Sequence, residues 1–235
     1  MRNMKRVHKA KIVFFAILML ALCRGAAKAQ FASYSNMLNT TMVASQSLFT
    51  AQTAVNKQRE SMRVAAGQSP YESTPAAQPP VRQYAITATD FRALSGPIMP
   101  DQFADSATGV TPEVREQMRA FFKQVLTAFE KDARKNNIAN AFAFITSAAL
   151  QLRNGKEPTN AEEDQLIAHF NNALAASPGY YTLNPRQQQM LYESLIINGG
   201  IMVFLDTEGK QLNNPPMRAQ AMEMSKQVLR AYLGI

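Results

Sequence analysis

Repeated helix-start signals constrain what the C-terminal half of this 235-residue chain can form. A Thr or Asn that can cap a helix stands before a proline at Thr111-Pro112, Asn184-Pro185 and Asn214-Pro215. Proline suits the first helical position because its missing N–H is not needed there. Thr159, with Glu162 three residues later, adds a capping box. The sequence therefore predicts four helix N-termini from residue 111 onward.

Apolar residues recur at helical spacing between these starts. Three segments have one apolar face: Val114, Met118, Phe121, Val125 and Phe129; Leu166, Phe170 and Leu174; Met217, Ala221, Met224, Val228 and Tyr232. Two others, 138–152 and 192–205, are apolar on nearly every side. Helices of that kind belong at the centre of a bundle. The sequence thus predicts an all-α fold, a bundle of about five helices with 138–152 and 192–205 as its central members.

The segment 195–205 also admits a second interpretation. Its Asn198-Gly199 pair lies between β-branched runs, which is a strong signal for a tight hairpin turn. We favour a helix, because the neighbouring chain is helical and a lone hairpin is weakly stable. Glycines in such a helix would mark close approach to a neighbouring helix, and we expect small partners there: Ala139, Ala143 and Ser147.

Helix ends are predicted where glycines follow the apolar pattern, at Gly155, Pro178-Gly179, Gly209 and Gly234. Residues 84–110 lack a helical pattern, although the Thr-rich ITAT resembles a short strand. A single strand has nothing to pair with, so we expect an irregular loop wrapped over the helical core.

The chain before residue 84 has a different composition. Residues 30–66 are rich in Ser, Thr, Asn, Gln and Ala, with no charge before Lys57. They carry an interrupted apolar stripe, which predicts a marginal or partner-dependent helix. Residues 67–83 contain four prolines and are predicted to form an extended linker. The predicted helical domain therefore covers 84–235.

Residues 1–29 have the three-part pattern of a secretory signal peptide. The first eleven residues include five Lys or Arg and no acid, residues 12–23 are continuously apolar, and Ala27-Lys28-Ala29 provides small residues for cleavage. The pattern predicts an exported protein, periplasmic or extracellular, that begins at Gln30.

Removal of this leader changes the charge of the chain. Seven of the 25 basic residues and none of the 17 acidic residues precede Gln30, which leaves 18 basic and 17 acidic residues. A nearly neutral protein gains little from counterion release, so no nucleic-acid partner is predicted. The one cysteine, Cys23, lies in the leader, so disulfides and thiolate chemistry are excluded from the remainder. Later apolar runs fall short of about 20 residues, and no stable membrane span is predicted after the leader.

Four residues are candidates for contact with a ligand or partner. Asp90 and Arg92 lie in the 84–110 loop, and loops often carry functional residues. Tyr180 and Tyr181 lie in the loop SPGYYTLNP, where their rings could stack on a sugar or peptide. The structural alternatives are a local turn made by Asp90 and packing of the tyrosines on a helix end.

Other polar residues fit structural roles better than chemical ones. His169 is the only histidine after the leader and borders an apolar face. Three acids at 162–164 suit the positive end of a helix dipole. Motifs for a nucleophile elbow, zinc protease, phosphate loop, dinucleotide fold and haem attachment are lacking. We therefore predict no catalytic residues, no metal and no cofactor.

Several segments resemble a family of exported bacterial proteins that is described only as a domain of unknown function. They are YAITATDFRAL with PIMPDQF, RKNNIANAFAFI, and LYESLIINGGIM. The resemblance spans about residues 84–234. It implies a helical domain in the bacterial envelope or outside the cell, and it supplies no activity, ligand or catalytic residue.

Two functional hypotheses follow. The first is an exported, non-catalytic helical protein that binds another envelope or secreted protein, with the 31–66 segment as its interaction helix. The second is a small-ligand carrier or enzyme with a pocket between the helices and the 84–110 loop, using Asp90 and Arg92.

Overall fold

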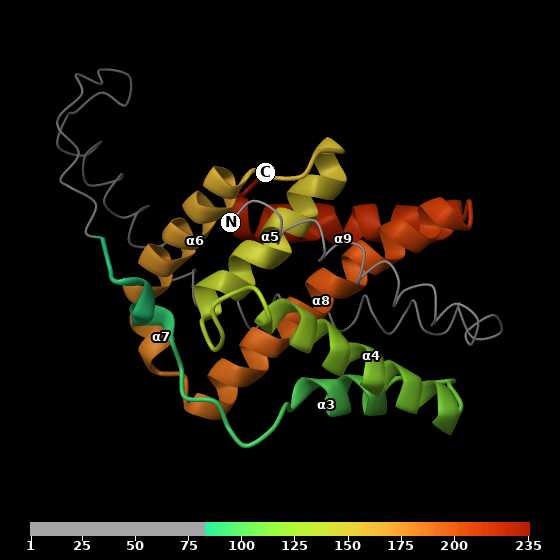
Figure 1. Cartoon of the computed structure of the whole chain (residues 1–235), viewed down its shortest axis with the longest axis horizontal. Helices are drawn as coiled ribbons and strands as arrows, with labels where there is room; N and C mark the ends of the chain where they lie inside the picture. The colour runs from blue at the N-terminus through green and yellow to red at the C-terminus, as the bar shows by residue number, and fades with distance from the viewer. Residues whose placement is uncertain (1–82) are drawn as a thin grey trace, which may run out of the picture.

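The computed structural model describes residues 83–235, so the predicted leader, the 30–66 segment and nearly all of the linker lie outside it. The described residues form an all-α bundle with no β-strand among them (Figure 1). A 3-10 turn, η1 (Ile86–Thr89), comes first. The helices are α3 (Met99–Ser106), α4 (Pro112–Glu130), α5 (Ile138–Asn154), α6 (Asn160–Ala175), α7 (Pro178–Tyr181), α8 (Pro185–Gln211) and α9 (Pro215–Leu233).

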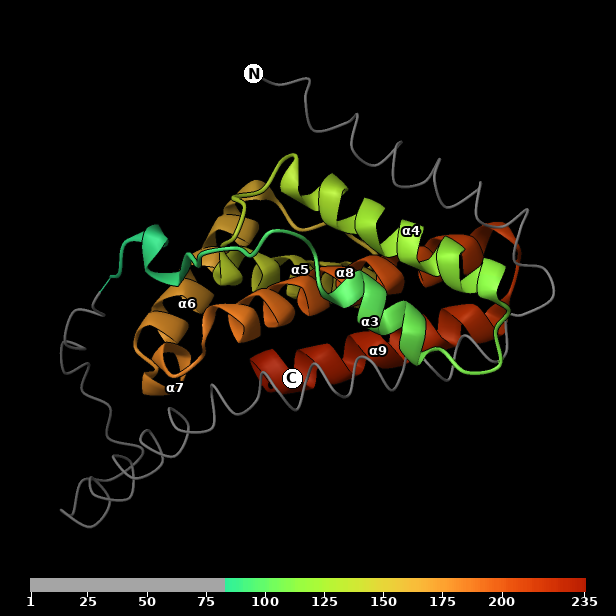
Figure 2. The ribbon, with the colours of Figure 1, turned by 90° about the horizontal axis from the view of Figure 1, so that it is seen from below.

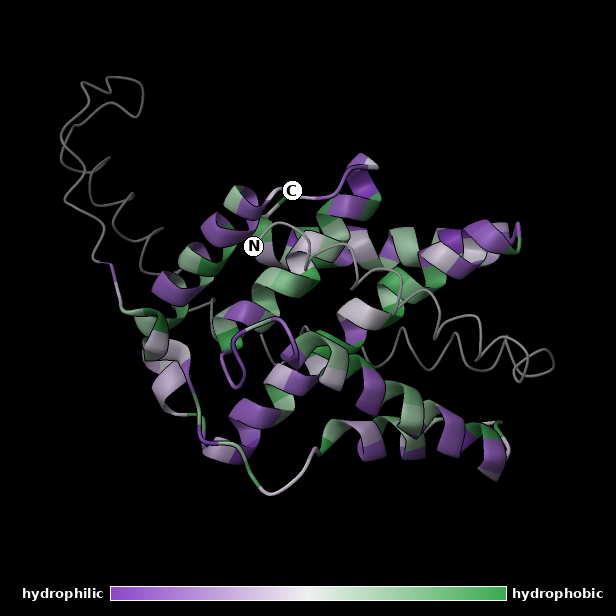
Figure 3. Ribbon diagram, in the orientation of Figure 1, coloured by the Kyte–Doolittle hydropathy of each residue, from purple (hydrophilic) through white to green (hydrophobic). Residues whose placement is uncertain are grey.

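The two predicted central helices are α5 and α8, and the structure confirms their position. They pack against each other, and both also pack against α9, while α6 covers α5 and α4 covers α8. Figure 2 shows α5 and α8 between α4 on one side and α9 on the other. Hydrophobic residues gather along α5 and the middle of α8 (Figure 3). The five long helices agree with the expected number, and α3 and α7 are short additions.

All four predicted N-caps are confirmed. Thr111, Thr159, Asn184 and Asn214 each accept a hydrogen bond on the side chain from the backbone N–H three residues later. The capping box at Thr159 is present, and Asn184 forms a second one with Gln187. The residue types within three positions of each start were therefore sufficient to predict where these helices begin.

The segment 195–205 is helical, as we favoured, and lies inside α8. Its glycines do mark close approach, but the expected partners are wrong. A Cβ at Gly199 would lie 2.6 Å from Cε1 of Phe144 and 3.4 Å from Cα of Ile145, and one at Gly200 would lie 2.5 Å from Cγ1 of Val125. The glycines therefore leave room for the rings and branches of larger residues on α5 and α4.

Two predicted helix ends are confirmed, at Gly155 and Gly234, both in the left-handed conformation. Gly209 was wrongly predicted to end a helix, because α8 continues to Gln211. There a Cβ would lie 2.6 Å from Cγ of Arg218 on α9, so Gly209 serves close packing of two helices. The predicted stop at Pro178-Gly179 is close, because α6 ends at Ala175, although Gly179 itself lies within the short helix α7.

The α8 helix is long and apolar enough to cross a membrane by length and composition, since Gly199 and Gly200 do not interrupt it. However, 72% of its most apolar stretch is buried inside the bundle. This burial is typical of the central helix of a folded domain.

Residues 84–98, which we call the strap, run outside the bundle from α6 toward α3 (Figure 1). The expected irregular loop is confirmed in the strap, where ITAT forms η1 rather than a strand. It is wrong for residues 99–106, which form α3. This helix buries Met99, Pro100, Phe103 and Ala104, and it packs against α4 and α8.

Candidate functional site

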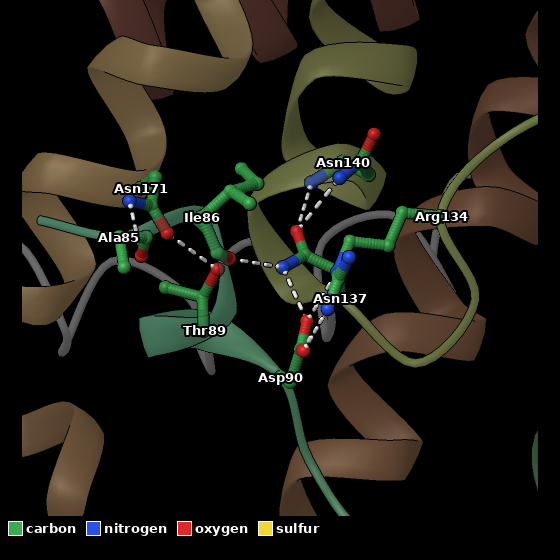
Figure 4. A network of polar contacts seen from close by, with 8 residues as sticks. All are labelled: Ala85, Ile86, Thr89, Asp90, Arg134, Asn137, Asn140 and Asn171. Carbon is green, nitrogen blue, oxygen red and sulfur yellow. Dashed lines mark hydrogen bonds and ion pairs between the residues drawn. The ribbon is translucent and has the colours of Figure 1, made fainter.

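The sequence candidate Asp90 lies in a network of polar side chains that joins the strap to the bundle (Figure 4). The Arg134 guanidinium, in the loop between α4 and α5, donates to both carboxylate oxygens, with Nε 2.8 Å from Oδ1 and Nη2 2.5 Å from Oδ2. Asn137 donates from Nδ2 to the same Oδ1 at 2.8 Å. Three donors thus converge on one carboxylate, which fixes the end of η1.

Asn137 is the centre of this network and is fully buried. Its Nδ2 also donates to the backbone oxygen of Ile86 at 2.8 Å, while its Oδ1 accepts from the backbone N–H and the Nδ2 of Asn140 at 3.0 and 2.8 Å. The same side chain therefore caps α5 and holds η1. A backbone bond from Phe91 N to Asn136 O, at 2.9 Å, lies beside it.

A second anchor holds the beginning of the strap to α6. The hydroxyl of Thr89 donates to Oδ1 of Asn171 at 2.9 Å. Asn171 Nδ2 donates to the backbone oxygens of Tyr84 and Ala85, each at 3.1 Å. The backbone N–H of Tyr84 donates a hydrogen bond to Oδ1 of Asn172 at 2.9 Å. Two adjacent residues of α6 therefore bind the first residues of the domain.

A third anchor comes from Gln189 and Glu193, one turn apart on α8. Gln189 accepts from Leu94 N at 2.7 Å and donates to Gly96 O at 2.8 Å. The Glu193 carboxylate accepts from the N–H groups of Ile98 and Met99 at 2.8 and 2.7 Å, which are orphan donors at the start of α3. A bond of 2.6 Å from Gln189 to Glu193 ties the pair together. The end of the strap is therefore held by side chains almost a hundred residues away.

The two carboxylates in these anchors are perturbed in opposite directions. The Arg134 hydrogen bonds lower the pKa of Asp90, so Asp90 is held as the anion. Burial raises the pKa of Glu193, which is only 4% exposed, although the Met99 amide, the Gln189 side chain and the Ile98 amide act against that rise. The hydrogen bonds described for Asp90 come from Arg134 and Asn137, and those described for Glu193 come from Ile98, Met99 and Gln189.

No hydrogen bond or ion pair is described between Asp90 and any of the other three candidates. Arg92 is exposed on the strap, and Asp90 is bonded to Arg134 instead. Tyr180 is buried, and burial, followed by the charges of Tyr181 and Asp90, raises its pKa to about 12, so Asp90 lies near enough to act on Tyr180 through space. Tyr181 is 61% exposed, and its hydroxyl donates to Ala175 O at 3.1 Å. The two rings contact each other edge-on at 5.3 Å, at the end of α6.

The described residues also contain a groove of about 480 Å³, at the opposite end of α6 from these tyrosines. It lies between the end of α5, the start of α6 and the end of α9, and residues such as Leu150, Leu166, His169 and Leu233 line it. His169 is exposed there and contacts the Phe170 ring. No residue of 84–110 lines this groove.

In the described part of the chain, no group of three or more His, Cys, Asp or Glu residues is arranged to hold a metal ion. The anchoring residues Asn137, Asn171, Gln189 and Glu193 were missed by the sequence reasoning. Their partners are backbone groups far away in the chain, and no local pattern signals such pairing. Only Asn137 had a visible signal, as an Asn before a helix.

The fold and its contacts define a helical-bundle domain whose N-terminal strap is held by three side-chain anchors. The chain belongs to a family of unknown function (DUF6683), whose model matches residues 8–235. This match reaches much further toward the N-terminus than the resemblance seen over 84–234, and its range includes the 30–66 segment and most of the predicted leader. No curated protein and no solved structure matches the chain.

Proposed function

We propose that the protein is exported and acts as a non-catalytic interaction module, in which the 30–66 segment binds another envelope or secreted protein. The observation that carries the proposal is the anchoring of the strap. Most of residues 84–98 are exposed, apart from the buried Thr89 and Phe91, and side chains from α6, the α4–α5 loop and α8 hold the strap by at least eight hydrogen bonds. Such anchoring fixes where the preceding linker leaves the domain.

A fixed exit point matters for binding when the residues before it, the 30–66 segment, are the ones that contact the partner. A linker of 17 residues (67–83) spans at most about 60 Å when fully extended, so the exit point sets the volume that the 30–66 segment can search. The apolar stripe of that segment, with Leu38 and Leu48 among its members, is too interrupted for a stable isolated helix. A partner that covers the stripe would supply the missing burial.

The acidic groups of the strap network support a structural role. A general base or nucleophile needs free lone pairs that face a substrate. Asp90 instead uses its oxygens for Arg134 and Asn137, and Glu193 uses its oxygens for two backbone amides and Gln189. The groove lies away from Asp90 and Arg92, so a ligand pocket under the 84–110 loop gains no support from it.

Co-purification from the native envelope followed by mass spectrometry tests the proposal. We expect the unaltered chain to retain a partner, and deletion of residues 30–83 with the leader kept to abolish its capture while the domain stays folded by circular dichroism. Equal capture by both proteins would contradict the proposal.

A pair of charge-matched variants separates the stripe from the mere presence of the segment. Leu38→Asp with Leu48→Asp places two charges on the predicted stripe, whereas Asn36→Asp with Thr50→Asp places two charges on the same predicted helix away from the stripe. Capture should be lost in the first variant and kept in the second. Equal retention by both variants would show that the stripe is not the binding surface.

A further inference from the structure

The end of the α8–α9 hairpin encloses an acid that the proposed function does not use. Glu208 lies three residues before the end of α8 and is 0% exposed. Neither of its carboxyl oxygens has a hydrogen-bond partner. It is the only carboxyl group in residues 83–235 with both oxygens buried and unbonded.

Glu193 on the same helix shows how α8 treats another buried acid. Glu193 is 4% exposed, and its oxygens accept two backbone amides and the Gln189 side chain. Glu208 has no comparable contact, so burial costs its charged form far more.

The surroundings of Glu208 are apolar and tightly closed. Ile201 and Leu205, seven and three residues earlier, share its side of α8 and are fully buried. The next residue, Gly209, lies so close to α9 that a Cβ would be 3.0 Å from the backbone N of Arg218. The turn is closed by bonds of 2.8 Å from Leu212 N to Glu208 O and from Asn214 N to Gly209 O.

Charged groups near the tip do not compensate Glu208. On α8, Asp206 and Lys210 pair with each other at 2.5 Å. On α9, Arg218 is exposed and covers Gly209 with its aliphatic stem. Burial is the cause that raises the pKa of Glu208, with no contribution from a described charge on α3, α4, α5 or α9, the helices that pack against α8.

We propose that the tip of the α8–α9 hairpin, residues 205–218, is a pH-responsive latch, closed while Glu208 holds its proton and opened when Glu208 ionises. The closed tip accommodates a neutral carboxyl group at modest cost, whereas an ionised one gains solvation only if the tip opens to water. Because the closed state raises the pKa of Glu208 above 4.5, closure is favoured below about pH 4.5 and weakens as pH rises through the raised value.

Amide hydrogen exchange of the full chain between pH 4.5 and 8.5 tests the latch. After correction for the intrinsic exchange rate, the opening constant at Leu212 and Asn214 should rise, by at most about tenfold per pH unit, since one proton is released. A pH-independent opening constant at these amides would overturn the proposal.

Substitutions assign the effect to Glu208. Glu208→Gln removes the titration at nearly constant shape and should give a flat profile, and Glu208→Met provides the same test without an amide if Glu208→Gln folds poorly. Glu223→Gln is the matched control, because Glu223 lies on the exposed face of α9 with its side chain 60% exposed, and it should keep the unaltered slope. Retention of the slope in both Glu208 variants would show that another group controls the tip.

Discussion

Individual side chains in this domain do several structural tasks at once, and Asn137 is the clearest example. One buried amide caps α5, binds the backbone of η1 and positions Asp90. Each task is a hydrogen bond, so one substitution at Asn137 would remove the acceptor of the Asn140 N–H and the donor to Ile86 O and Asp90 Oδ1. The strap is therefore sensitive to single atoms, even though most of its residues are exposed.

We expect Asn137→Ala to lower the free energy of unfolding by about 2–4 kcal/mol, because it removes a helix cap and two long-range bonds. Urea titration measures this loss. Asn154→Ala is the control, since Asn154 is exposed at the end of α5 and its replacement should cost less than about 0.5 kcal/mol. A loss of similar size in both variants would argue against a central role for Asn137.

The glycines of α8 give a second prediction at the scale of the residue. We expect Gly199→Leu to lower Tm by roughly 5–10 °C, because a larger side chain must displace Phe144 and the backbone of Ile145. Gly96→Leu should change Tm by less than about 2 °C, because nothing lies within 4 Å of a Cβ there. Differential scanning calorimetry compares the two, and an unchanged melt for Gly199→Leu would contradict the close approach.

The positions of the helices were predicted from the sequence better than the contacts between distant residues. Helix starts depend on side chains within three residues, and central helices depend on their own composition, so both could be read along the chain. The start of α3 has no such signal, because the side chain that satisfies its first N–H groups is Glu193 on α8. The wrong end at Gly209 has a similar cause, since that glycine serves packing on α9. The sequence therefore missed α3 and misplaced the end of α8, because both depend on distant partners. Most hydrogen bonds of the strap network were missed for the same reason.

The dependence of α3 on Glu193 can be measured directly. Glu193→Ala should leave two N–H groups without acceptors, cost roughly 2–4 kcal/mol and remove hydrogen-exchange protection at Ile98 and Met99. Glu193→Gln keeps one acceptor oxygen and should retain part of the protection. If exchange at Ile98 and Met99 were unaffected in Glu193→Ala, the proposed anchor would be wrong.

At the scale of the whole molecule, the perturbed acids predict how stability depends on pH. Hydrogen bonds lower the pKa of Asp90, Glu113 and Glu162, so their contributions are present above about pH 4–4.5 and decline as pH falls through the lowered values. Burial raises the pKa of Glu193 and Glu208, so the stability contributed by these two acids is present below about pH 4.5. It declines as pH rises through the raised pKa values. We therefore expect Tm to be highest in mildly acidic solution.

Thermal unfolding between pH 3 and 9 checks this profile. The double variant Glu193→Gln with Glu208→Gln should flatten the fall above pH 4.5 and leave the acid side unchanged. A Tm that rises steadily to pH 8 in the unaltered chain would contradict the assignment of Glu193 and Glu208 as the dominant buried acids.

The family model matches residues 8–235, a range that covers the helical domain together with the predicted linker, the 30–66 segment and most of the predicted leader. The proposed role depends on this arrangement, with a leader that directs export and a segment that the anchored domain presents to a partner. If the chain kept residues 1–29 and stayed in the cytosol, it would not meet an envelope or secreted partner, and the proposed role of the 30–66 segment would fail.

The mass of the native product tests this account most directly. Intact mass spectrometry of the protein isolated from its own cells should show a chain that lacks residues 1–29, begins at Gln30 and is recovered outside the cytoplasm. Recovery of the uncleaved chain of 26.0 kDa, starting at Met1 in the cytosolic fraction, would contradict it.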